Sequence, residues 1–265
     1  MYRLLIHPSW SLEKAWNSLE SSGFTIVYGS YEDNQTELII KDSPSLPSFK
    51  TFDWITSCEP ISLPPINWQE QWELHGHHFH DGYIHVDLGI HGKLKLQPGA
   101  GFGDLSHPTT RLMIKMIRNN RKRKYAFDIG CGSGILSLAT AAMGTEIVYG
   151  IDISSEAIDH SRQNACINEL EERCHFFLTT EIVEESFLSK IVEPVYIFMN
   201  MIRTEQFFAY SSSPFLHKLS GELLTSGIQI EERALYLDEM KKWGWKNAQE
   251  WEEEGWLGFR FFKEG

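Results

Sequence analysis

Three glycines at alternate positions, Gly130, Gly132 and Gly134, follow a short apolar run and precede small, helix-forming residues that begin at Ile135. An apolar strand, a glycine turn and a helix N-terminus form the corner of a doubly wound α/β sheet at which backbone can closely approach a ligand. The dinucleotide-binding fingerprint requires a further glycine where Ile135 stands. The turn therefore predicts a ligand site, but not one for NAD.

Two carboxylates accompany this turn. Asp128 lies just before it, and Asp152 ends the next apolar run, about twenty residues further on. A carboxylate aimed into the turn would repel a pyrophosphate and attract a positively charged ligand, and an acid at the second strand end is placed to accept both ribose hydroxyls. We therefore expect S-adenosylmethionine, with its ammonium and sulfonium, as the cofactor. The alternative, a βαβ unit whose glycines only permit tight packing, does not explain two acids at successive strand ends.

The catalytic residue is expected to be Asn200, which ends an apolar run at 196–200. Carboxyl ends of strands line the ligand crevice of such a sheet, so Asn200 should lie opposite Gly130. Transfer of a methyl group by in-line displacement needs mainly the alignment of a neutral acceptor amine, whose hydrogens the Asn200 side-chain oxygen is suited to accept. A plain turn former after a strand is the alternative interpretation of this residue.

A glycine-rich segment at 97–110 precedes a predicted amphipathic helix from Arg111 onward. Its composition suits either a loop that folds over a ligand or a plain surface loop. Thr109 or Thr110 would cap the helix and offer a hydroxyl to the site.

Other reactive side chains do not form a second site in the sequence. The packed histidine cluster lacks the paired spacing of zinc sites, so we expect no metal; its members are His75, His77, His78 and His80. Cys131 has no base placed to activate it and is expected to pack beneath the turn. The chain has 4 cysteines without metal-type spacing, which suggests a reducing compartment, and we expect a cytoplasmic protein.

The 265 residues suit one large domain and a small one. Residues 1–57 show a β-α-β-β order that resembles a trimmed ferredoxin-like module, and prolines punctuate a predicted linker at 58–68. Residues 69–265 then alternate strands and helices and end in a Trp- and Phe-rich pair of strands, which would close the sheet with an antiparallel edge. The expected fold is α/β: a seven-stranded Rossmann-like methyltransferase sheet with a small α+β N-terminal domain.

The net charge of −12 argues against direct binding of nucleic acid and would suit a basic protein partner, although solubility alone also explains it. No apolar run approaches the length of a membrane span, and the first residues do not look like a signal peptide. We expect a monomer that does not associate with membranes.

The motifs resemble those of the bacterial methyltransferase family that modifies large-subunit ribosomal protein eleven (the PrmA type). The resemblance runs from Trp68 to the C-terminus and is carried by the segments 101–103, 107–110, 128–136, 150–153 and 200–202, with Ala157-Ile158, Asn164-Ala165 and Asn168. It implies protein N-methylation of a basic ribosomal protein, recruited through the N-terminal domain. It also implies donor contacts through Thr110, Gly130, Asp152 and Asn200. Together with the motif itself, the expected cofactor-binding residues are Thr110, Asp128, Gly130, Gly132, Asp152 and Asn200.

Two features depart from the family pattern. Asp104-Leu105-Ser106 stands where the family loop reads Thr-Gly-Thr, which stiffens the loop and adds a charge near the donor. The N-terminal module is also short and matches poorly. A different protein or small-molecule amine acceptor, or a non-catalytic donor-binding module, therefore stays as an alternative.

Overall fold

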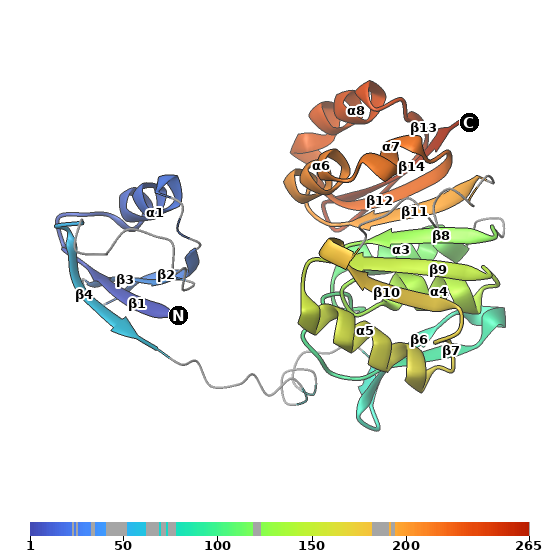
Figure 1. The fold of residues 1–265 in the computed structure, drawn as a ribbon, viewed down its shortest axis with the longest axis horizontal. Coiled ribbons are helices and arrows are strands. Elements are labelled where there is room, and N and C mark those ends of the chain that lie inside the picture. Colours follow the sequence, from blue (N-terminus) through green and yellow to red (C-terminus); the bar gives the residue numbers. More distant parts are fainter. Residues whose placement is uncertain are drawn as a thin grey trace. The chain divides into compact units, whose positions relative to one another are not determined.

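The computed structural model describes residues 1–22, 24, 26–32, 35–40, 52–61, 69, 73, 78–118, 123–181, 191 and 194–264. The chain divides into two compact units, Met1–Ile66 and Asn67–Gly265 (Figure 1). Several positions discussed above lie outside the described residues: positions 62–68 of the predicted linker at 58–68, which include Trp68 at the start of the family resemblance, and also His75 and His77.

The first unit is a four-stranded antiparallel sheet with one helix. Its sheet order is β2-β3-β1-β4, which is the ferredoxin-like order. Leu4, Ile6, Leu38 and Ile40 alternate with outward residues along β1 and β3, and Ala15 and Leu19 of α1 complete the buried core. The elements are β1 (Tyr2–Ile6), α1 (Leu12–Ser21), β2 (Ile26–Glu32), β3 (Gln35–Ile40) and β4 (Ile55–Pro60).

Two local features of this unit bear on the sequence expectations. The hydroxyl of Ser11 accepts the backbone N–H of Lys14 at 3.2 Å, so Ser11 caps α1. The edge strand β4 pairs antiparallel with β1 and extends three residues past position 57, into the segment expected to be linker. The module thus has one strand more than the predicted β-α-β-β order.

The second unit is built on a seven-stranded sheet of order β10-β9-β8-β11-β12-β14-β13. β8 to β12 run parallel, whereas β14 pairs antiparallel with both β12 and β13. This is the predicted seven-stranded Rossmann-like arrangement with an antiparallel edge. The strands are β8 (Tyr125–Ile129), β9 (Ile147–Asp152), β10 (Cys174–Leu178), β11 (Val195–Asn200), β12 (Gly221–Gln229), β13 (Lys246–Glu253) and β14 (Trp256–Lys263).

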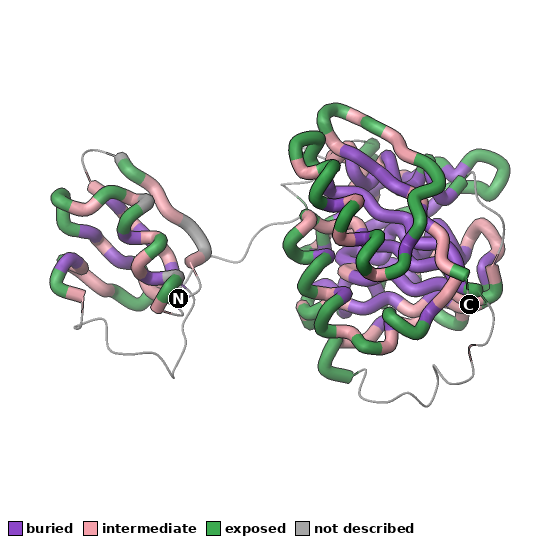
Figure 2. Tube along the Cα trace, turned by 90° about the horizontal axis from the view of Figure 1, so that it is seen from above, coloured by how far each residue is buried: buried purple, intermediate pink, exposed green. Residues whose placement is uncertain are grey.

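Helices cover both faces of this sheet, as Figure 1 shows, and its central strands β8, β11 and β12 are almost entirely buried within the core that Figure 2 shows. One face carries α3 (Pro108–Arg118), α4 (Ile135–Ala142) and α5 (Ser155–Ile167). The other carries α6 (Arg203–Ser212), α7 (Pro214–Lys218) and α8 (Arg233–Lys242). A small sheet of β5 (Phe79–His80), β6 (Tyr83–Asp87) and β7 (Lys93–Leu96) packs against the α4 and α5 face. Short 3-10 turns complete the unit: η2 (Gly89–His91), η3 (Thr179–Glu181) and η5 (Ile230–Glu232).

The chain leaves β8 toward β9 and β10 in one direction and returns to β11 on the other side, so the strand order reverses between β8 and β11. Ligands of open α/β sheets bind at the carboxyl ends of the strands at such a reversal. The register pairs Ile129 with Met199, so Gly130 and Asn200, the next residues, leave the sheet side by side. The parallel strands thus bring together residues seventy positions apart. None of the described helices has the length and apolar character to cross a membrane.

Candidate functional site

A cavity of about 820 Å³ opens at the carboxyl ends of β8, β9 and β11. Its size lies toward the upper end of the range for small-molecule sites, about 300–1,000 Å³. Four of the six expected cofactor residues line it: Gly130, Gly132, Asp152 and Asn200. Further parts of its wall come from the loop at 100–102, from His107 and Thr109, from the residues that join β9 to α5, from one side of α6, from the start of α7 and from Trp256.

The glycine turn forms the floor of this cavity. Gly130 and Gly132 both have positive φ, at 72° and 54°, which side-chain-bearing residues rarely adopt. The turn is tied to β9 because the N–H groups of Gly130 and Cys131 both donate to the carbonyl of Ile151, at 2.8 and 3.1 Å. A Cβ on Gly130 would lie 2.5 Å from the Met201 sulfur, and one on Gly132 would collide with the Phe102 carbonyl oxygen. Gly132 therefore requires glycine because of backbone packing, whereas at Gly130 the positive φ is the main constraint, since the Met201 side chain can move.

Asp152 lies at the tip of β9 with its carboxylate fixed by backbone. One oxygen accepts the N–H of Gly132 and the other that of Ser154, each at 3.0 Å. Ser154 in turn caps α5 through the N–H of Ala157. A carboxylate offers about four lone-pair sites, so each Asp152 oxygen can accept a further bond from a ligand in the cavity.

Asn200 ends β11 with an unused acceptor. Its side-chain oxygen is buried and has no hydrogen-bond partner among the described residues. The corner that follows is rigid because the side-chain amide of Gln206 donates to the carbonyls of Met201 and Ser226, at 2.7 and 2.8 Å. A buried unpaired acceptor is costly, so one that lies in a cavity wall marks a place where a ligand donor fits.

Asp128, expected to face the ligand, lies instead behind the turn. It is fully buried, and its carboxylate accepts the backbone N–H and the hydroxyl of Ser137, at 3.0 and 2.7 Å. Gly134 at the start of α4 has no side chain to cap the helix, and Asp128 supplies that acceptor from the neighbouring strand. Burial, with a smaller contribution from the charge of Asp152, raises the pKa of Asp128 to about 7.

Thr110 is likewise not part of the cavity wall. α3 begins at Pro108, so Thr109 and Thr110 lie within its first turn and neither caps it. Thr109 lines the cavity, and its hydroxyl lies 2.8 Å from Nδ1 of His107. The Thr110 hydroxyl is buried without a partner in the described part of the chain. Of the two neighbouring threonines, only Thr109 therefore lies in the cavity wall.

Three aromatic rings that are not among the expected site residues line the cavity. The His107 ring meets those of Phe102 and Trp256 edge to face, with centroids 5.5 and 5.3 Å apart. Burial and the neighbouring Arg111 lower the pKa of His107, which favours its neutral form. Trp256 comes from the start of β14, so no local sequence signal connects it with the turn.

The altered segment at 104–106 is built into the loop without entering the cavity. The Asp104 carboxylate accepts hydrogen bonds from the N–H and hydroxyl of Ser106, and Leu105 packs against the core. Arg111 donates to the carbonyls of Leu105 and Ser106, at 3.2 and 2.7 Å. The charge of Asp104 is thus held by its own loop and does not line the donor site.

The remaining candidates lie elsewhere. Cys131 is buried beneath the turn, and burial raises the pKa of its thiol well above the usual value, so it is no nucleophile. The structure brings His80, Asp81 and His85 together. The two imidazole rings stack at 3.7 Å and 10°. Nearly parallel rings direct their nitrogen lone pairs side by side and not toward one ion.

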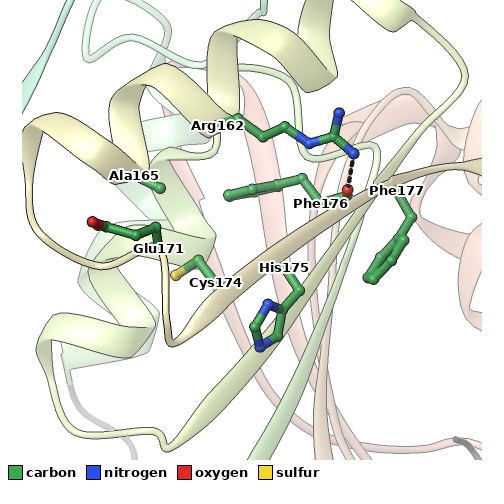
Figure 3. Close-up of a pocket in the computed structure, with 7 residues that line it drawn as sticks. All are labelled: Arg162, Ala165, Glu171, Cys174, His175, Phe176 and Phe177. Carbon is green, nitrogen blue, oxygen red and sulfur yellow. Dashed lines mark hydrogen bonds between the residues drawn. The ribbon is translucent and has the colours of Figure 1, made fainter.

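A second, smaller pocket of about 280 Å³ lies between α5 and the edge strand β10 (Figure 3). Arg162 crosses it to donate to the Phe176 carbonyl at 2.7 Å, and the thiol of Cys174 is buried with its pKa raised to about 12. None of the expected site residues lines this pocket, so the larger cavity is the candidate site.

Comparison with known proteins agrees with this location. Residues 86–264 match the model of the family described as ribosomal protein L11 methyltransferase (PrmA). The relative from Thiobacillus denitrificans, named ribosomal protein L11 methyltransferase, is 34% identical over 168 residues, which are 62% of this chain and 52% of the relative. A relative of the same name from Prochlorococcus marinus is 30% identical over 174 residues, 63% of this chain and 55% of its own.

The chain thus spans about half the length of these curated relatives. Among solved structures, SMU.776 complexed with SAH superposes with a TM-score of 0.52 at 9% identity, over 69% of this chain and 57% of that one. This likeness supports the fold alone. Because the family match covers well over half of the chain and includes the whole glycine-turn cavity, the chain belongs to the ribosomal protein L11 methyltransferase (PrmA) family.

Proposed function

We propose that this chain is an S-adenosylmethionine-dependent protein N-methyltransferase that methylates amino groups of a basic ribosomal protein, large-subunit protein L11 or a similar one. The observation that carries the proposal is the cavity in which Gly130, Asp152 and Asn200 meet at the strand reversal, within the segment that matches the family. The net charge of −12 suits a basic acceptor.

The residues of the cavity fit this cofactor. Asp152 has acceptor capacity left for ribose hydroxyls beyond its two backbone bonds. The side-chain-free turn lets backbone come close to the methionine part at Gly130. Ile153, 84% exposed, and Phe208, 70% exposed, offer apolar surface on the same cavity. When bound, S-adenosylmethionine supplies an electrophilic methyl group on a sulfonium.

The chain's own part in the reaction is to hold the acceptor. The unpaired oxygen of Asn200 accepts a hydrogen of a neutral acceptor amine and thereby points the amine lone pair into the cavity. Gln206, itself held by the Tyr236 hydroxyl at 2.6 Å, keeps the Asn200 corner in place. No acid–base pair is required, because the amine loses its proton before it binds.

The N-terminal module is proposed to recruit the acceptor protein. It has a hydrophobic core of its own, and the family match begins only at residue 86, so it is not needed to form the donor cavity. We place the reaction in the cytoplasm, in keeping with the four free cysteines.

The test is transfer of labelled methyl groups from S-adenosylmethionine to purified protein L11, with the product identified by mass spectrometry. We expect label on L11 amino groups. Label only on another protein or on a small amine in lysate would contradict the proposed acceptor. Donor binding without any transfer would contradict the enzymatic proposal and favour the non-catalytic alternative. That alternative is not favoured by the structure of the altered segment, because Asp104 bonds within its own loop and Leu105 packs against the core, outside the cavity.

A further inference from the structure

One side of α5 fastens the segment that borders the donor cavity. The side-chain amide of Asn168, the C-cap residue of α5, accepts the N–H of Lys95 at 2.9 Å and donates to the Lys95 carbonyl at 2.7 Å. One turn earlier, Asn164 accepts the N–H of Gln97 and donates to the carbonyl of Ser133, both at 2.9 Å. His160 is the next residue in this row, four positions apart, and residues at this spacing share a helix face.

His160 contacts the loop at two points. Its Nδ1 accepts the N–H of Gly101 at 3.0 Å, and its Nε2 lies 2.8 Å from the Gln97 carbonyl oxygen. Because Nδ1 is an acceptor, the proton of the neutral ring is on Nε2, which therefore donates to Gln97. The ring also packs so closely on Gly99 that a Cβ there would lie 2.5 Å from it. The imidazole thus contacts the loop closely at Gln97, Gly99 and Gly101.

The loop is in turn hydrogen-bonded to the glycine turn through Ser133. The Phe102 carbonyl accepts the N–H of Ser133 at 2.7 Å, and the Gly103 carbonyl accepts the Ser133 hydroxyl at 2.8 Å. Ala100, Gly101 and Phe102 line the cavity, whereas His160 does not. His160 is therefore separated from any ligand in the cavity by the loop that it holds.

We propose that His160 is a positioning residue for the donor cavity: its neutral, Nε2-protonated imidazole holds the loop 97–103 against the glycine turn and so completes the cavity wall. The inference rests on the proposed function for the identity of the donor, but not for the loop contact itself. His160 acts through Gly101 and touches no reacting atom.

The contact by which His160 holds the loop, the hydrogen bond from the Gly101 N–H to Nδ1 (below, the latch), requires a neutral imidazole. A proton on Nδ1 would place two donors face to face at Gly101 and break that bond. Burial lowers the pKa of His160, so the loop stays held at neutral pH and is released only as the pH falls below about 6.5, through the lowered value. Other charged or titratable groups on the elements around the ring are Asp104 and His107 in the segment that follows the loop, Asp152 beyond the turn, and Glu156, Asp159 and Arg162 on α5.

The experiment compares three variants of the full chain with the wild type. His160→Asn places an amide oxygen near the Nδ1 position and does not titrate, His160→Gln reaches the Gln97 carbonyl only, and His160→Ala removes both contacts. His91→Asn, at an exposed position of η2, is the matched control for loss of an imidazole. Hydrogen exchange of the peptide 97–103 reports the latch, and calorimetric titration with S-adenosylhomocysteine reports the cavity, each at pH 5.5 and 7.5.

At pH 7.5 we expect His160→Ala to lose loop protection and to bind about five- to tenfold more weakly, as loss of about one to two hydrogen bonds implies. His160→Asn should stay within about threefold of the wild type. From pH 7.5 to 5.5 the wild type and His91→Asn should lose affinity and protection, whereas His160→Asn should retain both, except for the part of the change in affinity that comes from protonation of His107 in the cavity wall.

Unchanged loop exchange in His160→Ala at pH 7.5 would overturn the proposal that His160 holds the loop. Should His160→Ala not fold, the comparison of His160→Asn with His160→Gln decides the same question, because only the former keeps the Gly101 bond. Wild-type protein that binds no S-adenosylhomocysteine at either pH would contradict the proposed function, while the exchange data would still test the latch.

Discussion

At the scale of single residues, the site depends on polar groups that the fold leaves with unused capacity. The Asn200 oxygen is buried in the cavity wall with no partner in the described chain, and the Asp152 oxygens each have lone pairs beyond their backbone bonds. Asp128 shows the opposite case, because its carboxylate is used up by Ser137. Whether Asp128 or Asp152 can bind a ligand is thus decided by how much of the hydrogen-bond acceptor capacity of each carboxylate the protein already uses.

Asn200 should separate catalysis from binding. Asn200→Ala removes the acceptor that orients the amine, so we expect turnover to fall by on the order of a hundredfold or more and donor affinity to fall by less. Single-turnover methylation and calorimetric titration measure the two effects.

Asn200→Asp is the control for this prediction. Its charge would favour the protonated amine, which has no lone pair, so turnover should be low near neutral pH and recover partly as the pH rises. An equal loss of binding and turnover in Asn200→Ala would make Asn200 a donor-binding residue only.

At the scale of elements, the glycine turn, α4 and the loop form one connected corner. Apolar runs and turn residues predicted the strands of the sheet, because each run is bounded by glycine or by a polar strand end. The edge strand β4 was missed because it ends in a proline, Pro60, and shows little alternation of buried residues. The contacts of His160 with Gln97 and Gly101 join residues about sixty positions apart, and no local pattern encodes them. α3 begins at Pro108, three residues before the predicted start, and of the two threonines in its first turn only Thr109 lines the cavity.

Buried Asp128 should make the stability of this corner depend on pH. Its pKa is raised to about 7 in the folded chain, so the folded state holds a proton that the unfolded state releases near pH 4, and this stabilisation is lost as the pH rises from about 4 to 7. Asp128→Asn keeps acceptor and shape without titrating. Its advantage in free energy of unfolding over the wild type should grow across that range, to at most about 4 kcal/mol.

Urea unfolding at several pH values measures this difference, with Asp238→Asn, at an exposed position of α8, as the control. A difference that stays constant from pH 4 to 7 would show that Asp128 is not buried as a neutral acid.

Gly132 should tolerate no side chain because of the loop. Its φ of 54° costs a non-glycine residue about 1–2 kcal/mol, and a Cβ would also collide with the Phe102 carbonyl. Gly82 also has a positive φ, at 81°, but open space around its Cβ position. We expect Gly82→Ala to lose only the backbone cost, and Gly132→Ala to lose clearly more stability together with donor affinity. Equal losses in urea unfolding would refute the close approach of the loop.

At the scale of the whole molecule, the chain consists of two units with separate hydrophobic cores. The first unit has its own buried cluster around Leu4, and the cavity belongs entirely to the second. The composition indicated two domains, because the length exceeds one small core and prolines separate the two patterns. It could not indicate which acceptor the first unit would recruit in the proposed function, since a surface that binds a protein leaves no short motif.

Leu4→Ala should therefore affect acceptor use and not donor binding. Truncating this buried residue should destabilise the first unit by about 2–5 kcal/mol. Methylation of the protein acceptor should fall when that unit unfolds, while affinity for S-adenosylhomocysteine stays within twofold. Leu138→Ala, in the core of the second unit, is the control and should weaken donor binding through instability. Reduced donor affinity in Leu4→Ala would contradict this division.

The central claim is that the cavity at the strand reversal binds the methyl donor through Asp152. Calorimetric titration of the full chain with S-adenosylhomocysteine, alongside Asp152→Ala and a thermal melt of both proteins, tests it most directly. The charge-assisted bonds that Asp152 offers are worth about 1.5–3 kcal/mol each, so we predict saturable binding by the wild type and at least tenfold weaker binding by a still folded Asp152→Ala. No binding by the wild type, or unchanged affinity in the variant, would contradict the account.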